Sequence, residues 1–559
     1  MKKLLLNFAF VFSVALLLSV GGRVMVGIAA SGLTANDLAM KSSADPKSTP
    51  APIASSSSTG AGANATSGFI VDHTKTDLAI PDIWIAEAKA SLHIAYEHTS
   101  HGSQLVTGMN ALEDYPDFGD TYAWVDDTHG DGDHLSMDDY GIPNGPNDLS
   151  QGDVDSDGDG IDDWAESTYD YLVDPSHYHV NVILWSWCNI AGHDIPRYLD
   201  SMEWLIGLFD EGGTHERAAE HPVKFVFITG HANGGGEGDS SDSQNQLIRT
   251  HVNENNRILY DFADMENYDP DENYFLNKRV EDDLDYDSTP PYDEGAKDAN
   301  WAVEYLARHD DSELDRLTTG ENVPGYNGAG SCAHSDGPDN LARLNCVLKG
   351  RAVWHLFARL AGWDGNPVED NLLASPDDSA LHLSWELTGT LPVSATWRIR
   401  YTGPAGDQPS PINDIPQTDR GLTLTGLTND ASYIVTLEAM LYDSPFMTAT
   451  VTATPTSNPT FAPSVDVSKL SSTNLRLSWA HSTGYDRYQI WRGLSPYFDL
   501  SGPDAGWVTA APWQFDDVGA LGDASVNYFY RIVGVKADGS STISPYVGEF
   551  DFAVAPGAP

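Results

Sequence analysis

Ester hydrolysis needs a serine, a histidine and amide donors in one place, and this chain carries these residue types next to predicted strands. Ser100 ends an apolar run and precedes the helix-like segment QLVTGMNAL. At such a strand-to-helix turn the hydroxyl lies at a helix N-terminus, where the dipole favours developing negative charge. His334, in a polar loop, can accept its proton. Amides at Gly192 and Asn233, after two further runs, can hold the oxyanion.

Each of these residues also has an ordinary structural explanation. Ser100 could do no more than cap the following helix, and Ser103 is an alternative nucleophile. Gly192 and Asn233 are common turn residues as well. The catalytic set that we predict is Ser100, His334, Gly192 and Asn233.

A rival chemistry uses imidazoles from the same loops. His98, His101, His231 and His334 all fall at predicted strand ends. Three imidazoles and a carboxylate could bind Zn²⁺ with an open position for activated water. His98 and His101 lack the helical spacing of an H-E-x-x-H site. A histidine-ligated, metal-dependent hydrolase is therefore an alternative to serine attack.

The elements that must position these residues are short apolar runs. They are LHIAYEHTS (92–100), VNVILWSW (180–187), VKFVFITG (223–230) and RILYDFAD (257–264). Runs without polar alternation favour parallel strands buried on both faces, and ligands of such sheets lie beyond the carboxyl ends of the strands. The segment 344–363 has helical apolar spacing and predicts a closing amphipathic helix.

The order of these blocks resembles the SGNH (GDSL-like) hydrolase superfamily. H-T-S at 98–100 takes the place of G-D-S, and the three later blocks take theirs at Gly192, Asn233 and His334. The resemblance covers about residues 85–364. It implies a flavodoxin-like, three-layer α/β domain, which we expect over residues 73–364.

One block departs from the superfamily at the acid that orients the imidazole, where this chain has Ser331. The resemblance leaves that role to Asp336, two residues after His334, or to a carboxylate of the 264–271 stretch. A Ser-His dyad is the remaining alternative.

An acidic insertion at about residues 125–175 carries a predicted calcium site. From Asp126 to Asp174 there are 16 Asp or Glu and no Lys or Arg. The string DSDGDGIDDWAE (155–166) has the ligand spacing of an EF-hand-like loop and resembles a thrombospondin type 3 or bacterial calcium repeat. We predict a structural Ca²⁺ and no organic cofactor; the alternative is a solvated acidic loop. The predicted ligands are Asp155, Asp157, Asp159, Asp163 and Glu166.

The three cysteines predict one covalent link. Cys332 and Cys346 are 14 positions apart, so in an exported protein a disulfide could join the His334 loop to the closing helix. Such a loop contributes about 3 kcal/mol to stability. Cys188 would remain a thiol.

The C-terminal part contains a repeat. LHLSW at 381–385 returns as LRLSW at 475–479, an offset of 475 − 381 = 94 residues, which is the length of one β-sandwich module. With Trp385 and Trp479 as core tryptophans and Tyr433 and Tyr528 on a late strand, these segments resemble fibronectin type III domains. We expect such domains at 366–455 and 461–554, so the predicted fold class is an α/β domain followed by two immunoglobulin-like sandwiches.

The N-terminus and the composition predict export. Residues 1–30 are typical of a signal peptide, although an uncleaved anchor remains an alternative, and residues 31–72 form a Ser/Ala/Pro/Gly-rich linker. The charge is 30 − 82 = −52, which argues against nucleic acid as a partner and against anionic membrane surfaces after cleavage. We expect a secreted or cell-surface bacterial protein.

The predicted function is a secreted serine esterase or deacylase. Modular export, together with 15 Trp and 24 Tyr that could stack on sugar rings, favours an ester of an extracellular polysaccharide or glycoconjugate. The alternative from another class is a non-catalytic, calcium-binding surface or matrix adhesion protein.

Overall fold

The computed structural model describes residues 68–143, 145–292, 297–404, 406–407, 411–457, 465–481, 484–523 and 525–548. The predicted signal peptide and nearly all of the predicted linker lie outside these residues. The description that follows treats the α/β region and the two sandwiches one at a time.

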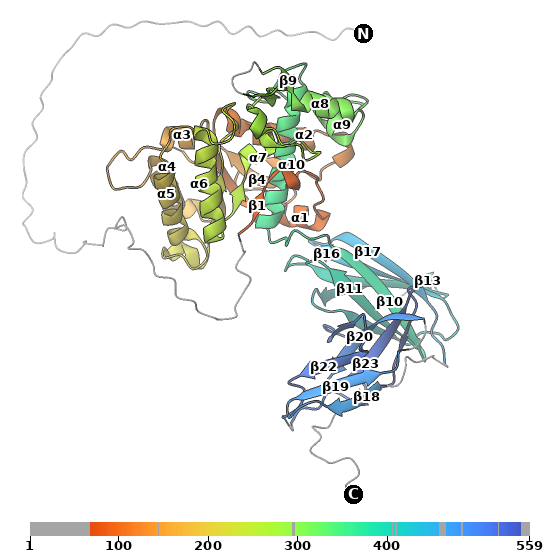
Figure 1. Ribbon diagram of the computed structural model, residues 1–559. Helices are drawn as coiled ribbons and strands as arrows, with labels where there is room; N and C mark the ends of the chain where they lie inside the picture. The colour runs from red at the N-terminus through yellow and green to blue at the C-terminus, as the bar shows by residue number, and fades with distance from the viewer. Residues whose placement is uncertain are drawn as a thin grey trace, which may run out of the picture. The chain divides into compact units, whose positions relative to one another are not determined.

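The α/β region is built on a seven-stranded parallel sheet (Figure 1). The strand order is β1-β7-β6-β5-β2-β4-β3, and every neighbouring pair is parallel. The strands are β1 (Ile70–Val71), β2 (His93–Glu97), β3 (Trp124–Val125), β4 (Leu135–Asp139), β5 (Val182–Trp185), β6 (Lys224–Ile228) and β7 (Leu259–Tyr260).

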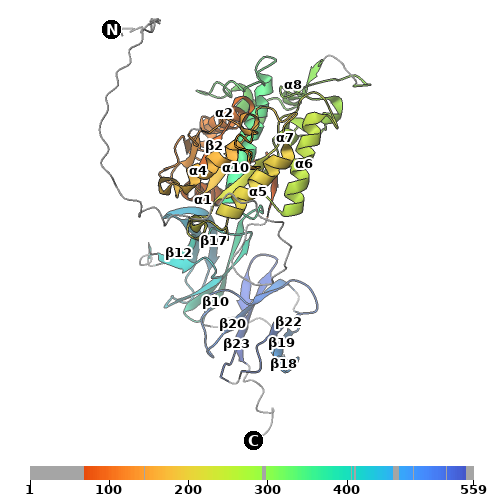
Figure 2. The ribbon, with the colours of Figure 1, turned by 90° about the vertical axis from the view of Figure 1, so that its left-hand side faces the viewer.

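Helices cover both faces of this sheet because alternate strand residues face opposite ways. Ile94 and Tyr96 of β2 belong to one buried cluster, while Ala95 between them belongs to the other. The first cluster includes side chains of α1 (Asp82–Ser91), α2 (Ser103–Glu113) and α10 (Leu344–Leu360), and the second those of α4 (Asp163–Val173), α5 (Ile195–Phe209) and α6 (Ser240–Asn255). Figure 1 shows these two helical layers with the sheet between them, and Figure 2 gives the view turned by 90°.

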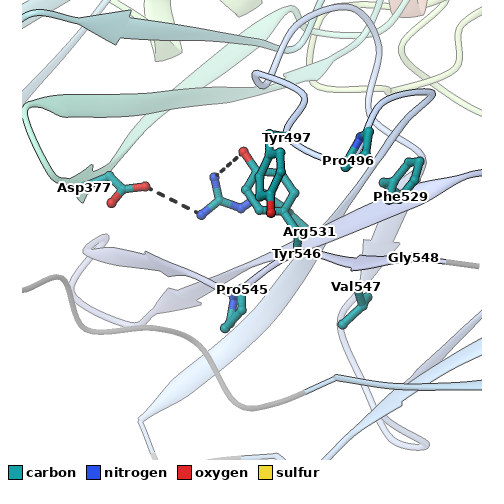
Figure 3. Close-up of a pocket in the computed structure, with 9 residues that line it drawn as sticks. All are labelled: Asp377, Pro496, Tyr497, Phe529, Arg531, Pro545, Tyr546, Val547 and Gly548. Atoms are coloured by element: carbon teal, nitrogen blue, oxygen red, sulfur yellow. Dashed lines mark hydrogen bonds and ion pairs between the residues drawn. The ribbon is translucent and has the colours of Figure 1, made fainter.

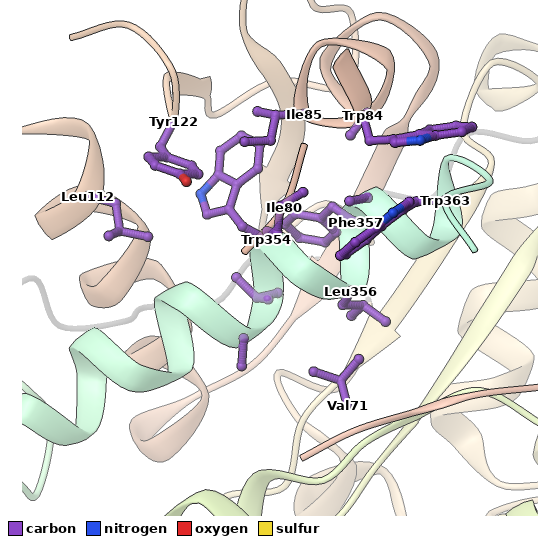
Figure 4. Packing of buried hydrophobic residues seen from close by; sticks show 14 of the residues in the cluster. Val71, Ile80, Trp84, Ile85, Leu112, Tyr122, Trp354, Leu356, Phe357 and Trp363 are labelled. Carbon is purple, nitrogen blue, oxygen red and sulfur yellow. The ribbon is translucent and has the colours of Figure 1, made fainter. Parts of the chain in front are cut away.

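Helix α10 is the central helix of its layer. Its residues from Leu344 to Ala358 are all buried, and Figure 4 shows Trp354 and Phe357 packed among side chains from other elements of the region. Burying a polar side chain is costly unless it is hydrogen-bonded, and Asn345 and Lys349 of this helix are hydrogen-bonded, whereas Trp354 Nε1 has no partner among the described residues. Among the described residues, no helix combines the length and the apolar character that crossing a bilayer requires.

The remaining elements of the α/β region are short. They are α3 (Leu149–Gly152), α7 (Phe262–Asn267), β8 (Asp285–Tyr286), β9 (Ala299–Asn300), α8 (Trp301–Arg308) and α9 (Glu313–Thr319). Of these, β8 pairs with β9 in a separate two-stranded sheet. The four predicted strand runs are confirmed as β2, β5, β6 and β7, and the closing helix is confirmed as α10.

The acidic segment 125–175 is predicted to be an insertion into the α/β domain, but part of it belongs to the central sheet. It contains β4, which pairs in parallel with β2 inside the sheet. Leu135, Ser136 and Met137 of β4 are buried, but carboxylates on both sides hide this short apolar core in the sequence.

The C-terminal part forms two antiparallel sandwiches. The first pairs the sheet β10-β11-β15 with β13-β12-β16-β17, and the second pairs β18-β19-β22 with β21-β20-β23-β24. Trp385 and Trp479 are buried in their cores, as expected. Tyr433 lies on a late strand, but Tyr528 directly precedes one. The strands are β10 (Glu369–Asp377), β11 (Ala380–Thr388), β12 (Thr396–Gly403), β13 (Gly406–Asp407), β14 (Ile412–Pro416), β15 (Gly421–Thr425), β16 (Tyr433–Leu441), β17 (Ser444–Ala453), β18 (Val465–Lys469), β19 (Asn474–Trp479), β20 (Tyr485–Gly493), β21 (Gly506–Val508), β22 (Gln514–Val518), β23 (Phe529–Lys536), β24 (Ser541–Ile543) and β25 (Val547–Gly548).

Candidate active site

Ser100 lies three residues beyond the carboxyl end of β2, in a tight turn that leads into α2. Its backbone φ is 51°, in the left-handed region that non-glycine residues rarely adopt. The turn is closed by Gly102, where an added Cβ would lie 2.1 Å from Ser186 Oγ and 2.3 Å from His98 Cβ. The turn therefore holds the Ser100 backbone in a conformation that costs energy.

The structure brings Ser100 and His334 together. Ser100 Oγ and His334 Nε2 are within hydrogen-bond distance, although the two residues are 234 positions apart. The other candidate, Ser103, donates its hydroxyl to the carbonyl of Ser100 at 2.6 Å. No hydrogen bond from the Ser100 side chain caps α2, so neither alternative reading of this turn is supported.

Three imidazoles stack beside the serine; we call His101, His231 and His334 the histidine cluster. The His101 ring lies 3.8 Å from the His231 ring and 4.2 Å from the His334 ring, centroid to centroid, with interplanar angles of 8° and 11°. His101 Nε2 is 2.6 Å from Asp282 Oδ2. The cluster thus connects the nucleophile to a carboxylate.

Burial and charge set the protonation states in this cluster. Burial lowers the pKa of His101 more than its hydrogen bond to Asp282 raises it. Burial raises the pKa of Asp282. The hydrogen bond from His101 and the charges of the three nearby imidazoles together lower this pKa by more than burial raises it, so the pKa of Asp282 is below its usual value. A neutral His101 must then carry its proton on Nε2 to donate to an ionised Asp282. Its Nδ1 is buried and has no hydrogen-bond partner among the described residues.

The predicted orienting acid, Asp336, is engaged elsewhere. Its carboxylate accepts from Ser331 Oγ at 2.6 Å, from the N–H of Cys332 at 3.0 Å and from Arg343 Nε at 2.7 Å. None of the hydrogen bonds of the described residues joins it to His334. The structure therefore does not bring Asp336 into hydrogen-bond contact with His334, because Ser331, the Cys332 amide and Arg343 occupy its carboxylate, and its orienting role stays a prediction.

The two predicted oxyanion donors also have partners of their own. The N–H of Gly192 donates to Gln244 Oε1 at 3.0 Å, and Asn233 Nδ2 donates to Ser241 Oγ at 3.1 Å. Both residues are exposed and follow β5 and β6 at the carboxyl edge of the sheet. No described hydrogen bond joins either one to Ser100 or His334, so their role stays a prediction.

The predicted disulfide is confirmed. Cys332 and Cys346 are bonded, with their Cα atoms 5.8 Å apart, so α10 is covalently tied to the loop that carries His334. The free cysteine among the described residues is Cys188, as expected.

The histidines of the metal alternative separate into two groups. His98 bonds Asp139 at the end of β4 and does not join the histidine cluster. His101, Asp282 and His334 offer ligand atoms that all lie within 4.8 Å of one another. Imidazole nitrogens and a carboxylate oxygen are donors that suit a divalent ion such as Zn²⁺. The set contains His101 and His334, two of the four predicted histidines, and Asp282, which the sequence analysis did not name.

The acidic loop assembles part of the predicted calcium site. Carboxylate oxygens of Asp155, Asp157 and Asp159 lie within 4.8 Å of one another, and Gly160 turns with a φ of 96°. These oxygens suit a hard cation such as Ca²⁺. Asp163 instead accepts from the N–H and Oγ of Ser156, at 2.9 and 2.6 Å. Glu166 lies in the first turn of α4, and its part in the site stays a prediction.

A separate cavity of about 470 Å³ is lined by residues of the second sandwich and by Asp377 of β10 (Figure 3). Figure 3 shows Arg531 between Asp377 and Tyr546, with Tyr497 close by. Its lining contains no nucleophile paired with a base, so it is not the candidate active site.

Comparisons with known proteins give no family for this chain. No family model and no curated protein matches it. Solved structures that match include a two-domain fibronectin type III segment of chicken tenascin (19% identity, 33% of this chain, 97% of that chain, TM-score 0.14). A second is pectate lyase PelI from Erwinia chrysanthemi in complex with tetragalacturonic acid (22% identity, 15% of this chain, 27% of that chain, TM-score 0.14). A third is the FN1-FN3 segment of chicken CNTN1 (13% identity, 32% of this chain, 62% of that chain, TM-score 0.14).

Proposed function

We propose that the α/β region is a serine hydrolase of carboxylic esters, of the SGNH type, with Ser100 as nucleophile and His334 as general base. The observation that carries the proposal is the contact between Ser100 Oγ and His334 Nε2. The positive φ of Ser100 supports it, because backbone strain concentrates at functional sites.

The strand order supports the choice of site. Numbered along the chain, β2, β4, β5, β6 and β7 lie in the order 2-1-3-4-5, which is that of flavodoxin-like sheets. The order reverses between β2 and β5, and ligands of such folds bind at this switch point. Ser100 follows β2 and Gly192 follows β5.

The reaction proceeds by acyl transfer. Ser100 Oγ attacks the acyl carbon while its proton passes to His334 Nε2. His334 returns this proton to the leaving alkoxide as the ester C–O bond breaks, which leaves an acyl-serine. Water then attacks the acyl carbon, gives a proton to His334, and the acid is released as Ser100 regains its proton.

Asp282 takes the electrostatic role that the prediction gave to Asp336. Its carboxylate oxygen lies within 4.8 Å of ligand nitrogens of both His101 and His334. The negative charge favours the imidazolium that His334 forms during attack. Gly192 and Asn233 remain the proposed oxyanion donors.

The rest of the chain sets the context of this activity. The proposal includes export, a structural Ca²⁺ held by the 155–166 loop, and two fibronectin type III modules. The pairing of a three-stranded with a five-stranded sheet in each sandwich supports the modules, as does the bond from the N–H of Thr428 to Tyr433 Oη at 3.0 Å, which is typical of a tyrosine corner. The proposed substrates are acyl esters of extracellular carbohydrate.

The test is hydrolysis of p-nitrophenyl acetate. Ser100→Ala and His334→Ala should each lower kcat by about 1000-fold or more. Ser243→Ala, which removes an exposed hydroxyl from α6, is the control and should keep full activity. An inert wild type, or full activity in both site variants, refutes the proposal; an inert wild type would leave the adhesion alternative.

A second candidate is the metal-dependent hydrolase, favoured by the convergence of His101, Asp282 and His334. Here these residues would hold Zn²⁺, which supplies activated water. Loss of activity on chelation, restored by Zn²⁺ but not by Ca²⁺, together with retained activity in Ser100→Ala, would select this candidate over the first.

A further inference from the structure

A buried ion pair lies near the histidine cluster. Lys349 of α10 and Glu266 of α7 are both 0% exposed, and Lys349 Nζ donates to Glu266 Oε1 at 2.6 Å. Lys349 Nζ also donates to Gln104 Oε1 and lies 3.5 Å from the centre of the Phe262 ring. Apolar residues of similar volume would stabilise a core at least as well as such a pair. Its contacts to the site loops give a reason for its presence.

Glu266 holds the loop that carries His231. Glu266 Oε2 accepts the N–H of Ala232, the residue after His231, at 2.5 Å. Trp301 Nε1 donates to the backbone carbonyl of Glu266 at 2.9 Å and fixes α7 from another side. A shift of this carboxylate therefore displaces the imidazole that stacks on His101.

Gln104 links the lysine to the nucleophile and to the base. It lies in the first turn of α2, four residues after Ser100, and is fully buried. Its Nε2 donates to the carbonyl of Ala333 at 2.5 Å, while its Oε1 accepts from Lys349. One side chain thus joins the segments of Ser100 and His334.

Asn345 extends the network to the backbone of Asp282. It lies four residues before Lys349, on the same face of α10, and is fully buried. Its Nδ2 donates to the carbonyl of Asp282 at 3.0 Å. The next residue, Cys346, forms the disulfide to the His334 loop.

We propose that Lys349, Glu266, Gln104 and Asn345 are positioning residues that set the relative places of Ser100, His231, Asp282 and His334. This inference rests on the proposed function of the same site. All four residues are 0% exposed, so they do not touch substrate and act through the loops they hold.

The charge state of the network fits this role. Burial lowers the pKa of Lys349 to about 8, and the charges of Glu266 and Asp282 offset only part of that effect. The lysine is therefore largely protonated at neutral pH. The other titratable group close by, Tyr260, donates its hydroxyl to the Lys349 carbonyl, and burial raises the pKa of that tyrosine well above its usual value.

The test compares Lys349→Met with Arg217→Met. Arg217 is also a buried cation, 1% exposed, but it donates to the carbonyls of Leu172, Val180 and His221, away from the site loops. With p-nitrophenyl acetate, Lys349→Met should lower kcat about 10- to 100-fold and leave KM within about twofold. Arg217→Met should lower thermal stability without lowering kcat. Gln104→Met, which keeps the volume, should lower kcat in the same way.

A readout without catalysis separates this inference from the proposed function. In protein with ¹⁵N-labelled histidine, Lys349→Met and Gln104→Met should shift the imidazole signals of the histidine cluster and leave that of His215 in place. If these signals move but wild type is inert, the proposed function fails and the positioning role stands. If Lys349→Met folds and its imidazole signals and kcat equal those of the wild type, the inference is overturned. If Lys349→Met does not fold, the inference is overturned when the imidazole signals and kcat of Gln104→Met equal those of the wild type.

Discussion

The positive φ of Ser100 predicts a difference in stability between two variants that both lack the nucleophile, Ser100→Gly and Ser100→Ala. Ser100→Gly and Ser100→Ala both lack the hydroxyl and its contact with His334, so comparing them isolates the backbone. At the φ of 51° observed for Ser100, alanine keeps a Cβ that crowds the backbone, whereas glycine has none. We expect Ser100→Gly to be the more stable of the two.

The size of this difference follows from two opposing effects. A left-handed conformation costs a non-glycine residue roughly 1–2 kcal/mol. The greater freedom of glycine in the unfolded chain offsets roughly 0.5–1 kcal/mol of that gain. With the middle of both ranges, the expected net effect is about 0.75 kcal/mol in favour of Ser100→Gly, or about a 3- to 4-fold change in the unfolding equilibrium.

Hydrogen exchange of the α10 amides from 344 to 358 measures this difference in the α/β region alone, because these residues are all buried and we expect them to open with the region. Ser103 provides the matched control: its φ is −64°, an ordinary helical value. There the glycine variant should be less stable than the alanine variant by about 0.5–1 kcal/mol. Equal or lower stability of Ser100→Gly against Ser100→Ala would refute the strain argument.

Three further predictions concern pH, calcium and the disulfide. The lowered pKa of Asp282 stabilises the fold above the pKa of an unfolded aspartate, about 3.9, and this contribution is lost as pH falls through the folded value. The stability gap between wild type and Asp282→Asn, from urea unfolding, should therefore shrink below about pH 4; a gap that is constant with pH contradicts this. Calcium at about 100 times its Kd should raise the free energy of unfolding of the wild type by ~2.7 kcal/mol. The double variant Asp157→Ala/Asp159→Ala should show no such rise. If calcium does not raise the melting temperature of the wild type, the loop does not bind the ion. Replacing Cys332 and Cys346 by serine should cost about 3 kcal/mol in urea unfolding, and a loss below about 0.5 kcal/mol would show that the packing of α10 alone holds the His334 loop.

Local pattern determined much of the architecture. Uninterrupted apolar runs mark strands buried on two faces, and apolar spacing marks α10, because burial selects residue type position by position. The spacing of Cys332 and Cys346 and the residue types of Ser100 and His334 were enough to predict partners that the structure brings together. The β4 strand escaped notice because its buried Leu135 and Met137 stand among carboxylates.

Only the tertiary structure decided which charged groups surround the serine. Asp282 contacts His101, and Asn345 of α10 holds its backbone carbonyl, whereas the carboxylate of Asp336 is bound by Arg343. Nothing in the sequence singles out Lys349, yet this residue is fully buried and bonds both Glu266 and Gln104. Which charged residues lie near Ser100 depends on how loops from distant parts of the chain come together at the carboxyl ends of the strands. The local apolar patterns that predict strands and helices carry no information about the course of these loops.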